Sequence, residues 1–279
     1  MTYPKLNSEP SGLGSSNYWC VVPAAGTGRR FNAQGNGNAE GSVPKQYASV
    51  LGKPVADWTL QALLSFKPFN TVVVSIAKED AWFHSLAAAK DPRLLVCEGG
   101  SDRWRSVLFG LEQLASRALP TDWVFVHDIA RPCVTSADLV KLQAFCQAQE
   151  EQETEQVSGA VLGIPVSDSL KRVRSDLDAD HQPMVTSSVD RSGLWQAYTP
   201  QVARFGDLLQ ALRTVALDQR RVNDEAEALE LLGKSVVMIQ GAPDNIKVTY
   251  PGDLNKVVSF FDDVELDGVS VDGAANKES

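Results

Sequence analysis

Short runs of β-branched and aromatic residues alternate with longer amphipathic stretches along most of this chain. This alternation restricts the fold more than any other feature, because strands that alternate with helices build a mainly parallel sheet with helices on both faces. Within the amphipathic stretches, apolar residues recur at helical spacing, as at Leu108, Leu111, Leu114 and Ala115. We therefore predict an α/β fold.

The expected sheet is Rossmann-like, mainly parallel and flanked by helices. Its expected strands are residues 18–23, 71–76, 93–97, 123–127, 157–164 and 235–240, and the expected helices are 55–66, 80–89, 103–117, 136–149, 205–219 and 225–232. Such sheets bind ligands at the carboxyl ends of their strands. The loops that leave those ends are therefore where we expect the chemistry.

One polar stretch, residues 165–191, interrupts the alternation. It contains the acidic segment 175–180, flanked by two β-branched runs, 170–173 and 185–189, that are able to pair as a long hairpin. We predict a protruding β-arm over about 165–191.

The two ends of the chain differ in composition from the middle. Residues 1–17 and 265–279 are rich in small and polar side chains, which is typical of disordered termini. The predicted organisation is a disordered leader at 1–17, one domain at 18–264 and a disordered tail at 265–279.

Bulk properties exclude several classes of partner. The formal net charge of -9 argues against a nucleic-acid partner, which needs a basic face. No apolar run reaches the roughly 20 residues that a membrane span requires, and the first residues lack the apolar core of a secretory signal. The cysteines have neither zinc-site nor disulfide-framework spacing. We expect a cytoplasmic protein that does not bind membranes.

The first predicted strand leads into a glycine-containing loop, residues 23–30, called the phosphate loop below. Its sequence is PAAGTGRR, and PKQ follows at 44–46. Glycines allow a sharp turn and bring backbone N–H groups close to an anion. Arg30 and Lys45 add positive charges, so the pattern fits the binding of a triphosphate.

Two other phosphate motifs fit this loop poorly. The dinucleotide pattern GxGxxG lacks its third glycine, where Phe31 stands, and no acidic residue follows the next strand before Glu79. The pattern GxxxxGK[ST] is also missing. An ordinary strand-to-helix loop without a ligand is the remaining alternative.

Six separated segments carry a more specific pattern. They are AAGTGRR at 24–30 with PKQY at 44–47, GGSDRWRS at 99–106, HDIARP at 127–132, DRSGLWQAYTPQ at 190–201, NDEA at 223–226 and DNIKVT at 244–249. In this order and spacing they resemble the methylerythritol phosphate cytidylyltransferases of the non-mevalonate isoprenoid route. The resemblance extends over about residues 18–261.

That resemblance implies an enzyme that transfers CMP from CTP to 2-C-methyl-D-erythritol 4-phosphate and releases pyrophosphate. It implies Mg2+ as cofactor, direct in-line attack by the substrate phosphate, and a homodimer formed through the arms. It assigns transition-state stabilisation to Arg30 and Lys45, and binding of the polyol phosphate to Arg191 and Lys247. It further assigns nucleotide contacts to Ala24, Ala25, Gly26, Thr27, Gly28, Gly100, Ser106 and Asp128, and substrate contacts to Arg131, Ser169 and Asn223. For the metal, we expect Asp128 or Asp244 to be the nearby carboxylate, in contact directly or through water.

The sequence departs from the family pattern in places. Ile129 replaces an alanine, and we expect it to tune nucleotide binding. Ser101 replaces an acidic residue, while Ser169 and Asn223 each replace a threonine and keep hydrogen-bonding capacity with altered geometry. The stretch between Arg30 and Pro44 is longer than the pattern, so the position of Lys45 in the free enzyme is left open.

Several of these residues also have ordinary structural interpretations. Asp128 is able to cap a helix, and Arg131 to act only as its ion-pair partner. His127 fits a packed core position better than a catalytic one. The run 223–225 reads equally well as a helix start, with Asn223 or Asp224 as the cap.

The proposed chemistry needs no general base. A phosphate monoester is mostly dianionic at neutral pH, because its second pKa is about 6, which suits a chain with three histidines and no recognisable nucleophile–base set. Three rival interpretations remain: the same chemistry on another polyol phosphate such as ribitol 5-phosphate, an inactive relative that binds nucleotide as a regulator, and a dinucleotide-dependent oxidoreductase.

Overall fold

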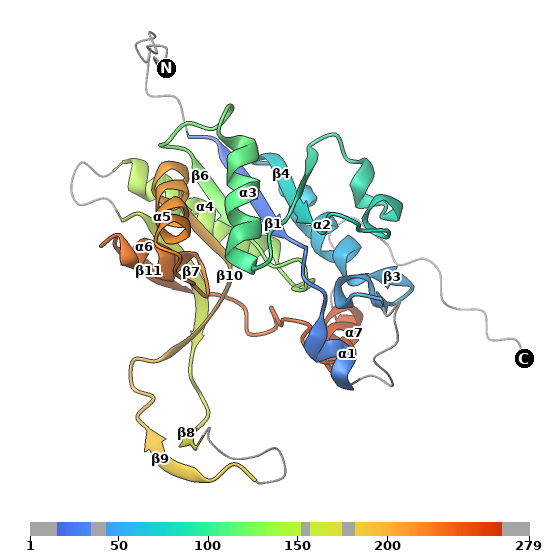
Figure 1. Cartoon of the computed structure of the whole chain (residues 1–279), viewed down its shortest axis with the longest axis vertical. Helices are drawn as coiled ribbons and strands as arrows, with labels where there is room; N and C mark the ends of the chain where they lie inside the picture. Colours follow the sequence, from blue (N-terminus) through green and yellow to red (C-terminus); the bar gives the residue numbers. More distant parts are fainter. Residues whose placement is uncertain (1–15, 35–42, 152–156, 175–181, 264–279) are drawn as a thin grey trace, which may run out of the picture.

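The computed structural model describes residues 16–34, 43–151, 157–174 and 182–263. A seven-stranded sheet forms its centre, in the order β11-β7-β10-β6-β1-β4-β5 (Figure 1). The strands are β1 (Tyr18–Pro23), β4 (Phe69–Ile76), β5 (Leu94–Glu98), β6 (Trp123–Val126), β7 (Gly159–Pro165), β10 (Trp195–Arg204) and β11 (Val236–Gln240). Every pairing in the sheet is parallel except those of β10, which runs antiparallel to β6 and β7. The predicted α/β class is confirmed.

Five of the six predicted helices are present within one to three residues of their expected ends. The helices are α1 (Arg29–Gln34), α2 (Val55–Ser65), α3 (Arg103–Leu114), α4 (Ser136–Glu150), α5 (Phe205–Leu217), α6 (Glu225–Leu231) and α7 (Asp253–Asp263). The sequence patterns did not predict α1 or α7. None of the helices in the described residues has the length and apolar character needed to cross a bilayer.

The helix predicted over 80–89 is wrong. Two single turns of 3-10 helix, Phe83–Ser85 and Ala88–Lys90, occupy this stretch. Side-chain carboxylates accept backbone N–H groups here: Asp80 accepts those of Trp82 and Phe83, and Asp57 accepts those of residues 87 and 88. The local bonds from Asp80 and the long-range bonds from Asp57 together satisfy donors that a longer helix would have used.

The sequence patterns did not predict the long central strand β10. Pro200 lies inside it, and proline is unfavourable in an interior strand. Pro200 falls where the pairing with β7 shifts register, between Tyr198 and Gln201. The missing N–H of proline therefore costs no ladder hydrogen bond at that point.

Alternate residues of the sheet enter two separate cores. On β1, Cys20 and Val22 belong to the core that α2 and α4 cover, while Trp19 and Val21 belong to the core under α3, α5 and α6. This is the period-two pattern of a strand buried on both faces. Figure 1 shows α3, α5 and α6 on the near side of the sheet.

A third, smaller cluster lies beside the phosphate loop. In it, α7 packs against α2, and the rings of Trp58 and Phe261 stack with centroids 4.2 Å apart. Val248, fully buried in the same cluster, belongs to the segment that leads into α7. A two-stranded ribbon of β2 (Ser49–Val50) and β3 (Lys53–Pro54) adds Val50 to this cluster.

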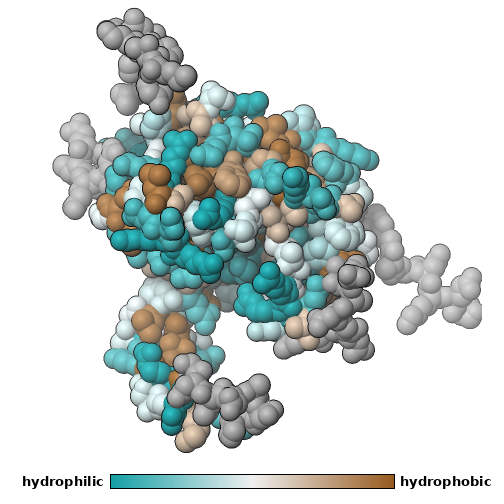
Figure 2. All heavy atoms as spheres, in the orientation of Figure 1, coloured by the Kyte–Doolittle hydropathy of each residue, from teal (hydrophilic) through white to brown (hydrophobic). Residues whose placement is uncertain are grey.

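The predicted arm is confirmed as a hairpin of β8 (Leu170–Val173) and β9 (Val185–Val189), which pair antiparallel and project from the body (Figure 1). Apolar side chains gather on the face of the arm seen in Figure 2. The exposed large apolar residues on the arm and at its base are Val173, Met184, Val185, Leu194 and Trp195. The acidic segment 175–180, most of the predicted leader and the predicted tail lie outside the described residues.

Candidate active site

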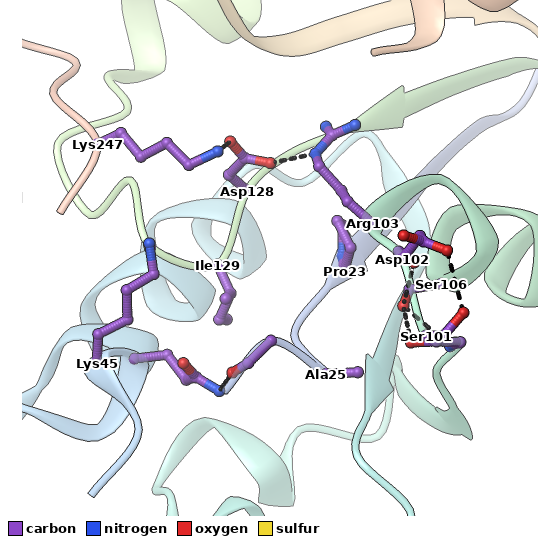
Figure 3. A pocket seen from close by; sticks show the side chains of 14 residues that line it. Pro23, Ala25, Lys45, Ser101, Asp102, Arg103, Ser106, Asp128, Ile129 and Lys247 are labelled. Carbon is purple, nitrogen blue, oxygen red and sulfur yellow. Dashed lines mark hydrogen bonds and ion pairs between the residues drawn. The ribbon is translucent and has the colours of Figure 1, made fainter. Parts of the chain in front are cut away.

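A cavity of about 160 Å3 opens at the carboxyl ends of β1, β5 and β6 (Figure 3). This is the edge at which open α/β sheets bind ligands. The residues that line it are Pro23, Ala25, Gly26, Lys45, Gln46, Gly100, Ser101, Asp102, Arg103, Ser106, Asp128, Ile129, Ala130 and Lys247.

The phosphate loop is held in shape by Gln46. This buried side chain donates 3.0 Å hydrogen bonds from Nε2 to the carbonyl oxygens of both Ala24 and Gly26. Gly28 has a φ of +69°, and a Cβ at that position would lie 3.1 Å from the backbone nitrogen of Lys45. Glycine is therefore required both for the conformation and for the close approach of Lys45.

Asp128 is the buried anionic centre of the cavity. Its Oδ2 lies 2.6 Å from Lys247 Nζ, and its Oδ1 lies 2.7 Å from Arg103 Nε, as the dashed lines of Figure 3 show. Arg131 Nε lies 3.6 Å from Oδ2. Burial alone would raise the pKa of Asp128, but the three cations outweigh it and hold the pKa well below its usual range.

The backbone at Asp128 is fixed by Thr199, which also contacts the neighbouring His127. Asp128 N–H donates to Thr199 Oγ1 at 3.0 Å, and that hydroxyl lies 3.1 Å from His127 Nδ1. His127 Nε2 lies 3.0 Å from the carbonyl oxygen of Arg131, which only accepts, so Nε2 carries the proton. Burial lowers the pKa of His127 to about 4. His127 is therefore a neutral, packed residue, as its sequence context indicated.

Lys45 reaches the cavity from the 3-10 turn Lys45–Tyr47. Its Nζ donates a 2.6 Å hydrogen bond to the carbonyl oxygen of Val248, next to Lys247. Burial, together with the neighbouring charges of Lys247, Arg30 and Arg131, lowers the pKa of Lys45 to about 8 against the opposing effect of Asp128. An ammonium group so placed has few counter-charges and suits an anionic ligand.

The opposite wall of the cavity is built from closely packed backbone. The Ser106 hydroxyl accepts the N–H of Gly100 at 3.0 Å, and a Cβ on Gly99 would lie 2.5 Å from that of Ala25. On Gly100, a Cβ would lie 2.4 Å from that of Arg105. Glycine at both positions therefore lets backbone polar groups border the cavity.

The structure brings together about half of the site residues named from the sequence. Those that line the cavity are Ala25, Gly26, Lys45, Gly100, Ser106, Asp128 and Lys247. Others lie close behind it or on its rim: Ala24 is buried behind the loop, Arg131 contacts Asp128, and Thr27, Gly28 and Arg30 belong to the loop or to α1. Within this one subunit, Ser169 and Arg191 are exposed on the arm, and Asn223 and Asp244 are exposed outside the lining.

Two structural interpretations from the sequence are settled by hydrogen bonds. Asp128 caps no helix, because the next helix, α4, starts at Ser136 and its N-cap is Thr135. At α6 the cap is Asp224, whose side chain accepts the N–H of Glu227. Asn223 instead donates to the Glu227 carboxylate.

Arg103 lines the cavity, but the sequence patterns assigned it no role. It stands at the first position of α3, where a positive charge opposes the helix dipole. An arginine in that unfavourable position indicates that carboxylates lie nearby to compensate its charge. Arg103 has two such partners, Asp128 and Glu225, and its Nη1 lies 2.7 Å from Glu225 Oε1. Ser101 and Asp102, which also line the cavity, were not assigned a role either.

Comparison with known proteins gives one consistent result. The sequence profile of the family described as "IspD: 2-C-methyl-D-erythritol 4-phosphate cytidylyltransferase" matches residues 19–261. The chain is 41% identical over 241 residues to the 2-C-methyl-D-erythritol 4-phosphate cytidylyltransferase of Ectopseudomonas mendocina, covering 86% of this chain and 94% of that protein. It is 41% identical over 238 residues to the enzyme of that name from Pseudomonas fluorescens, covering 85% of this chain and 92% of that protein.

Solved structures agree with the sequence relatives. A crystal structure of 4-diphosphocytidyl-2C-methyl-D-erythritol synthase superposes with a TM-score of 0.69 at 31% identity, covering 88% of this chain and 99% of the other. The Francisella tularensis 2-C-methyl-D-erythritol 4-phosphate cytidylyltransferase gives a TM-score of 0.69 at 28% identity, covering 88% of this chain and 100% of the other.

Proposed function

The chain belongs to the 2-C-methyl-D-erythritol 4-phosphate cytidylyltransferase family and so transfers CMP from CTP to that polyol phosphate, releasing pyrophosphate; we propose that the cavity at Asp128 is where this transfer takes place. The observation that carries the proposal is the convergence of Lys45 and Lys247 on one cavity, although they come from opposite ends of the domain.

The reaction brings two anions together. The nucleophile is a phosphate monoester, mostly dianionic near neutral pH, and the electrophile is the α-phosphorus of a triphosphate. Two unit charges about 4 Å apart repel by roughly 4 kcal/mol at an effective dielectric constant of 20. Cationic side chains on both reactants reduce this repulsion, and in-line alignment supplies much of the remaining rate acceleration.

We assign the nucleotide phosphates to the phosphate loop and Lys45. The Lys45 ammonium is half-buried, and Arg30 is near enough to influence its pKa. Both groups would stabilise the charge that builds on the α-phosphate during transfer. Lys247 would leave its ion pair with Asp128 and then bind the phosphate of the incoming substrate.

Mg2+ suits the same cavity. Mg2+ binds through one or two carboxylates together with substrate phosphate oxygens, and the cavity presents the carboxylates of Asp128 and Asp102. Among the described residues no group of three His, Cys, Asp or Glu side chains is placed to hold a metal without substrate. When bound, the ion neutralises phosphate charge. Asp128 is the better candidate ligand, because Asp244 is exposed and outside the lining.

Base recognition is proposed for the wall at Gly99 and Gly100. Cytosine needs a donor for its ring acceptors and an acceptor for its amino group. The N–H groups of Gly99 and Gly100 already donate to the Ile76 carbonyl oxygen and to Ser106, so we assign backbone carbonyl oxygens of this wall to the cytosine amino group. Ser106 fixes the turn through its bond with the Gly100 N–H. Ile129 also lines the cavity, so its larger side chain narrows the space beside the nucleotide.

We further propose a cytoplasmic homodimer assembled through the arm. Exposed apolar residues on the arm, Met184 and Val185 among them, support an interface there. Arg191 and Ser169 are also on the arm and outside the cavity lining of their own subunit. Both would then serve the cavity of the partner subunit.

Pyrophosphate release tests the function directly. The purified protein would be supplied with Mg2+, CTP and either methylerythritol phosphate or ribitol 5-phosphate, with UTP and ATP as alternative nucleotides. We expect turnover only with CTP and a clear preference for methylerythritol phosphate. Preference for ribitol 5-phosphate would move the substrate assignment, and no turnover with any pair would favour a nucleotide-binding regulator.

A further inference from the structure

The carboxylate of Glu225 lies directly behind the cavity without lining it. Its side chain is 2% exposed. Its two oxygens accept hydrogen bonds from both terminal nitrogens of Arg103, at 2.7 and 3.0 Å. This is the two-pronged geometry in which arginine and a carboxylate fix each other most firmly.

Helix α6 does not need this carboxylate for capping. The side chain of Asp224 accepts the N–H of Glu227, and the oxygen of the Gln201 side chain accepts the N–H groups of both Glu225 and Ala226. The first donors of the helix are thus already satisfied. The Glu225 carboxylate is therefore free to accept both of its hydrogen bonds from Arg103.

Arg103, held by Glu225, in turn fixes the orientation of the Asp128 carboxylate. Two of its nitrogens contact Glu225, and the third, Nε, lies 2.7 Å from Asp128 Oδ1. Because a guanidinium is planar, holding two corners sets the direction of the third. The other oxygen of Asp128, Oδ2, is thereby directed towards Lys247.

Stability alone is a weak reason for this arrangement. Replacing a buried ion pair by apolar side chains of similar volume is often neutral or stabilising. The arginine also stands at the start of α3, against the helix dipole. Two unfavourable placements that meet beside a ligand cavity are typical of a functional site.

We propose that Glu225 is a positioning residue for the transfer reaction, which acts through Arg103 to orient the Asp128 carboxylate. The inference rests on the proposed role of Asp128 in the cavity. Without the Glu225 carboxylate, the guanidinium is held at one corner only. It then rotates, and Asp128 loses the orientation that serves the reacting phosphates.

The first test is Glu225→Gln, which keeps size and removes the charge. We expect kcat to fall at least about tenfold while KM for CTP changes less than about threefold, because orientation matters most in the transition state. Glu225→Asp keeps the charge but shortens the side chain, so its kcat should lie between those of the unaltered enzyme and Glu225→Gln. The matched control is Glu230→Gln, an exposed position on the same helix, with kcat within about twofold of the unaltered enzyme.

A double-mutant cycle separates positioning from a general effect on folding. In an Arg103→Lys enzyme, adding Glu225→Gln should lower kcat by less than about a further twofold, because the link from Glu225 through the guanidinium to Asp128 is already lost. Independent, multiplying losses would overturn the proposal. Should Glu225→Gln not fold, Glu225→Met, which keeps the volume without a polar group, takes its place with the same criterion.

Asp128→Asn distinguishes this inference from the proposed function. Normal turnover in Asp128→Asn would remove the role of Asp128, and with it the basis for positioning. If Asp128→Asn is impaired while a folded Glu225→Gln enzyme keeps kcat within about twofold of normal, Glu225 has no positioning role and the proposed function stands.

Discussion

Lys45 Nζ lies 2.6 Å from the carbonyl oxygen of Val248, and this hydrogen bond joins the phosphate loop region to the segment that carries Lys247. Two cationic side chains from distant parts of the sequence are thereby held beside one cavity. Both lysines are thus held beside the cavity without a ligand, with Lys247 paired to Asp128. The position of Lys45, which the sequence left open, is therefore defined in the structure.

Lys45→Ala should lower kcat at least about a hundredfold with a modest change in KM for CTP, because the lost group acts mainly in the transition state. We expect the same of Arg30→Ala. Steady-state pyrophosphate release measures both. Lys78→Ala, at an exposed position outside the cavity lining, is the matched control. Near-normal turnover in Lys45→Ala or Arg30→Ala would remove the role assigned to that residue.

The pKa of Lys45 predicts a pH limit. With a pKa of about 8 instead of the ordinary 10.5, Lys45 is charged below pH 8 and becomes neutral above it. Since kcat/KM reports the free enzyme, kcat/KM for CTP should fall as the pH rises through about 8. In Lys45→Arg, whose guanidinium stays charged, this fall should disappear. An identical alkaline limb in the arginine variant would exclude Lys45 as its source.

Asp128→Asn should lower the free energy of unfolding at pH 7 by about 3 kcal/mol, because three cations then face an uncharged amide. The folded pKa of Asp128 is depressed, so its ion pairs stabilise the protein above the unfolded pKa of about 3.9 and this contribution is lost as the pH falls below it. Urea unfolding at pH 7 and near pH 3.5 should show a smaller difference at the lower pH. An equal difference at both values would contradict the assignment.

Mixed dimers test whether Arg191 acts across the proposed interface. A Lys45→Ala subunit paired with an Arg191→Ala subunit contains one intact site if Arg191 serves the partner, and none if it serves its own subunit. Random mixing should then restore about a quarter of normal activity, since half of the dimers are mixed and each has one of two sites. Mixtures that stay inactive would place Arg191 in its own subunit's site.

Ile129→Ala should change KM for CTP by up to about 150-fold and leave kcat nearly unchanged, because a methylene group in a pocket contributes about 1–3 kcal/mol to discrimination. Ile129 is 5% exposed and lines the cavity. A tenfold or larger loss of kcat would show that its packing also shapes the reacting groups, as would a matching loss in Ile129→Val.

The sheet was predictable where strand and helix patterns were regular. The strand at Tyr18–Pro23 and both strands of the arm have the predicted bounds. Side-chain hydrogen bonds explain the failed helix at 80–89, and proline explains the missed strand β10. In both cases a local rule was overridden by contacts between segments far apart in the sequence.

The sequence predicted several residues of the site but not the contacts between them. The resemblance named Lys45, Asp128 and Lys247, and the structure places all three on one cavity. It gave no sign that Arg103 joins Asp128 to Glu225, because an ion pair between distant segments leaves no spacing pattern. Ser169 and Arg191 lie on the arm outside the cavity lining, and their assigned roles depend on the proposed second subunit.

The burial of Val248 beside α2 and α7 has a consequence for synthesis of the protein. All seven strands of the sheet precede Lys247 in the chain. Domains begin to fold from the N-terminal end while translation continues, so the sheet can assemble on the ribosome before the second lysine emerges. An incomplete product that stopped after β11 would lack Lys247, the Val248 carbonyl oxygen that Lys45 contacts and the packing of α7, and we expect it to be inactive.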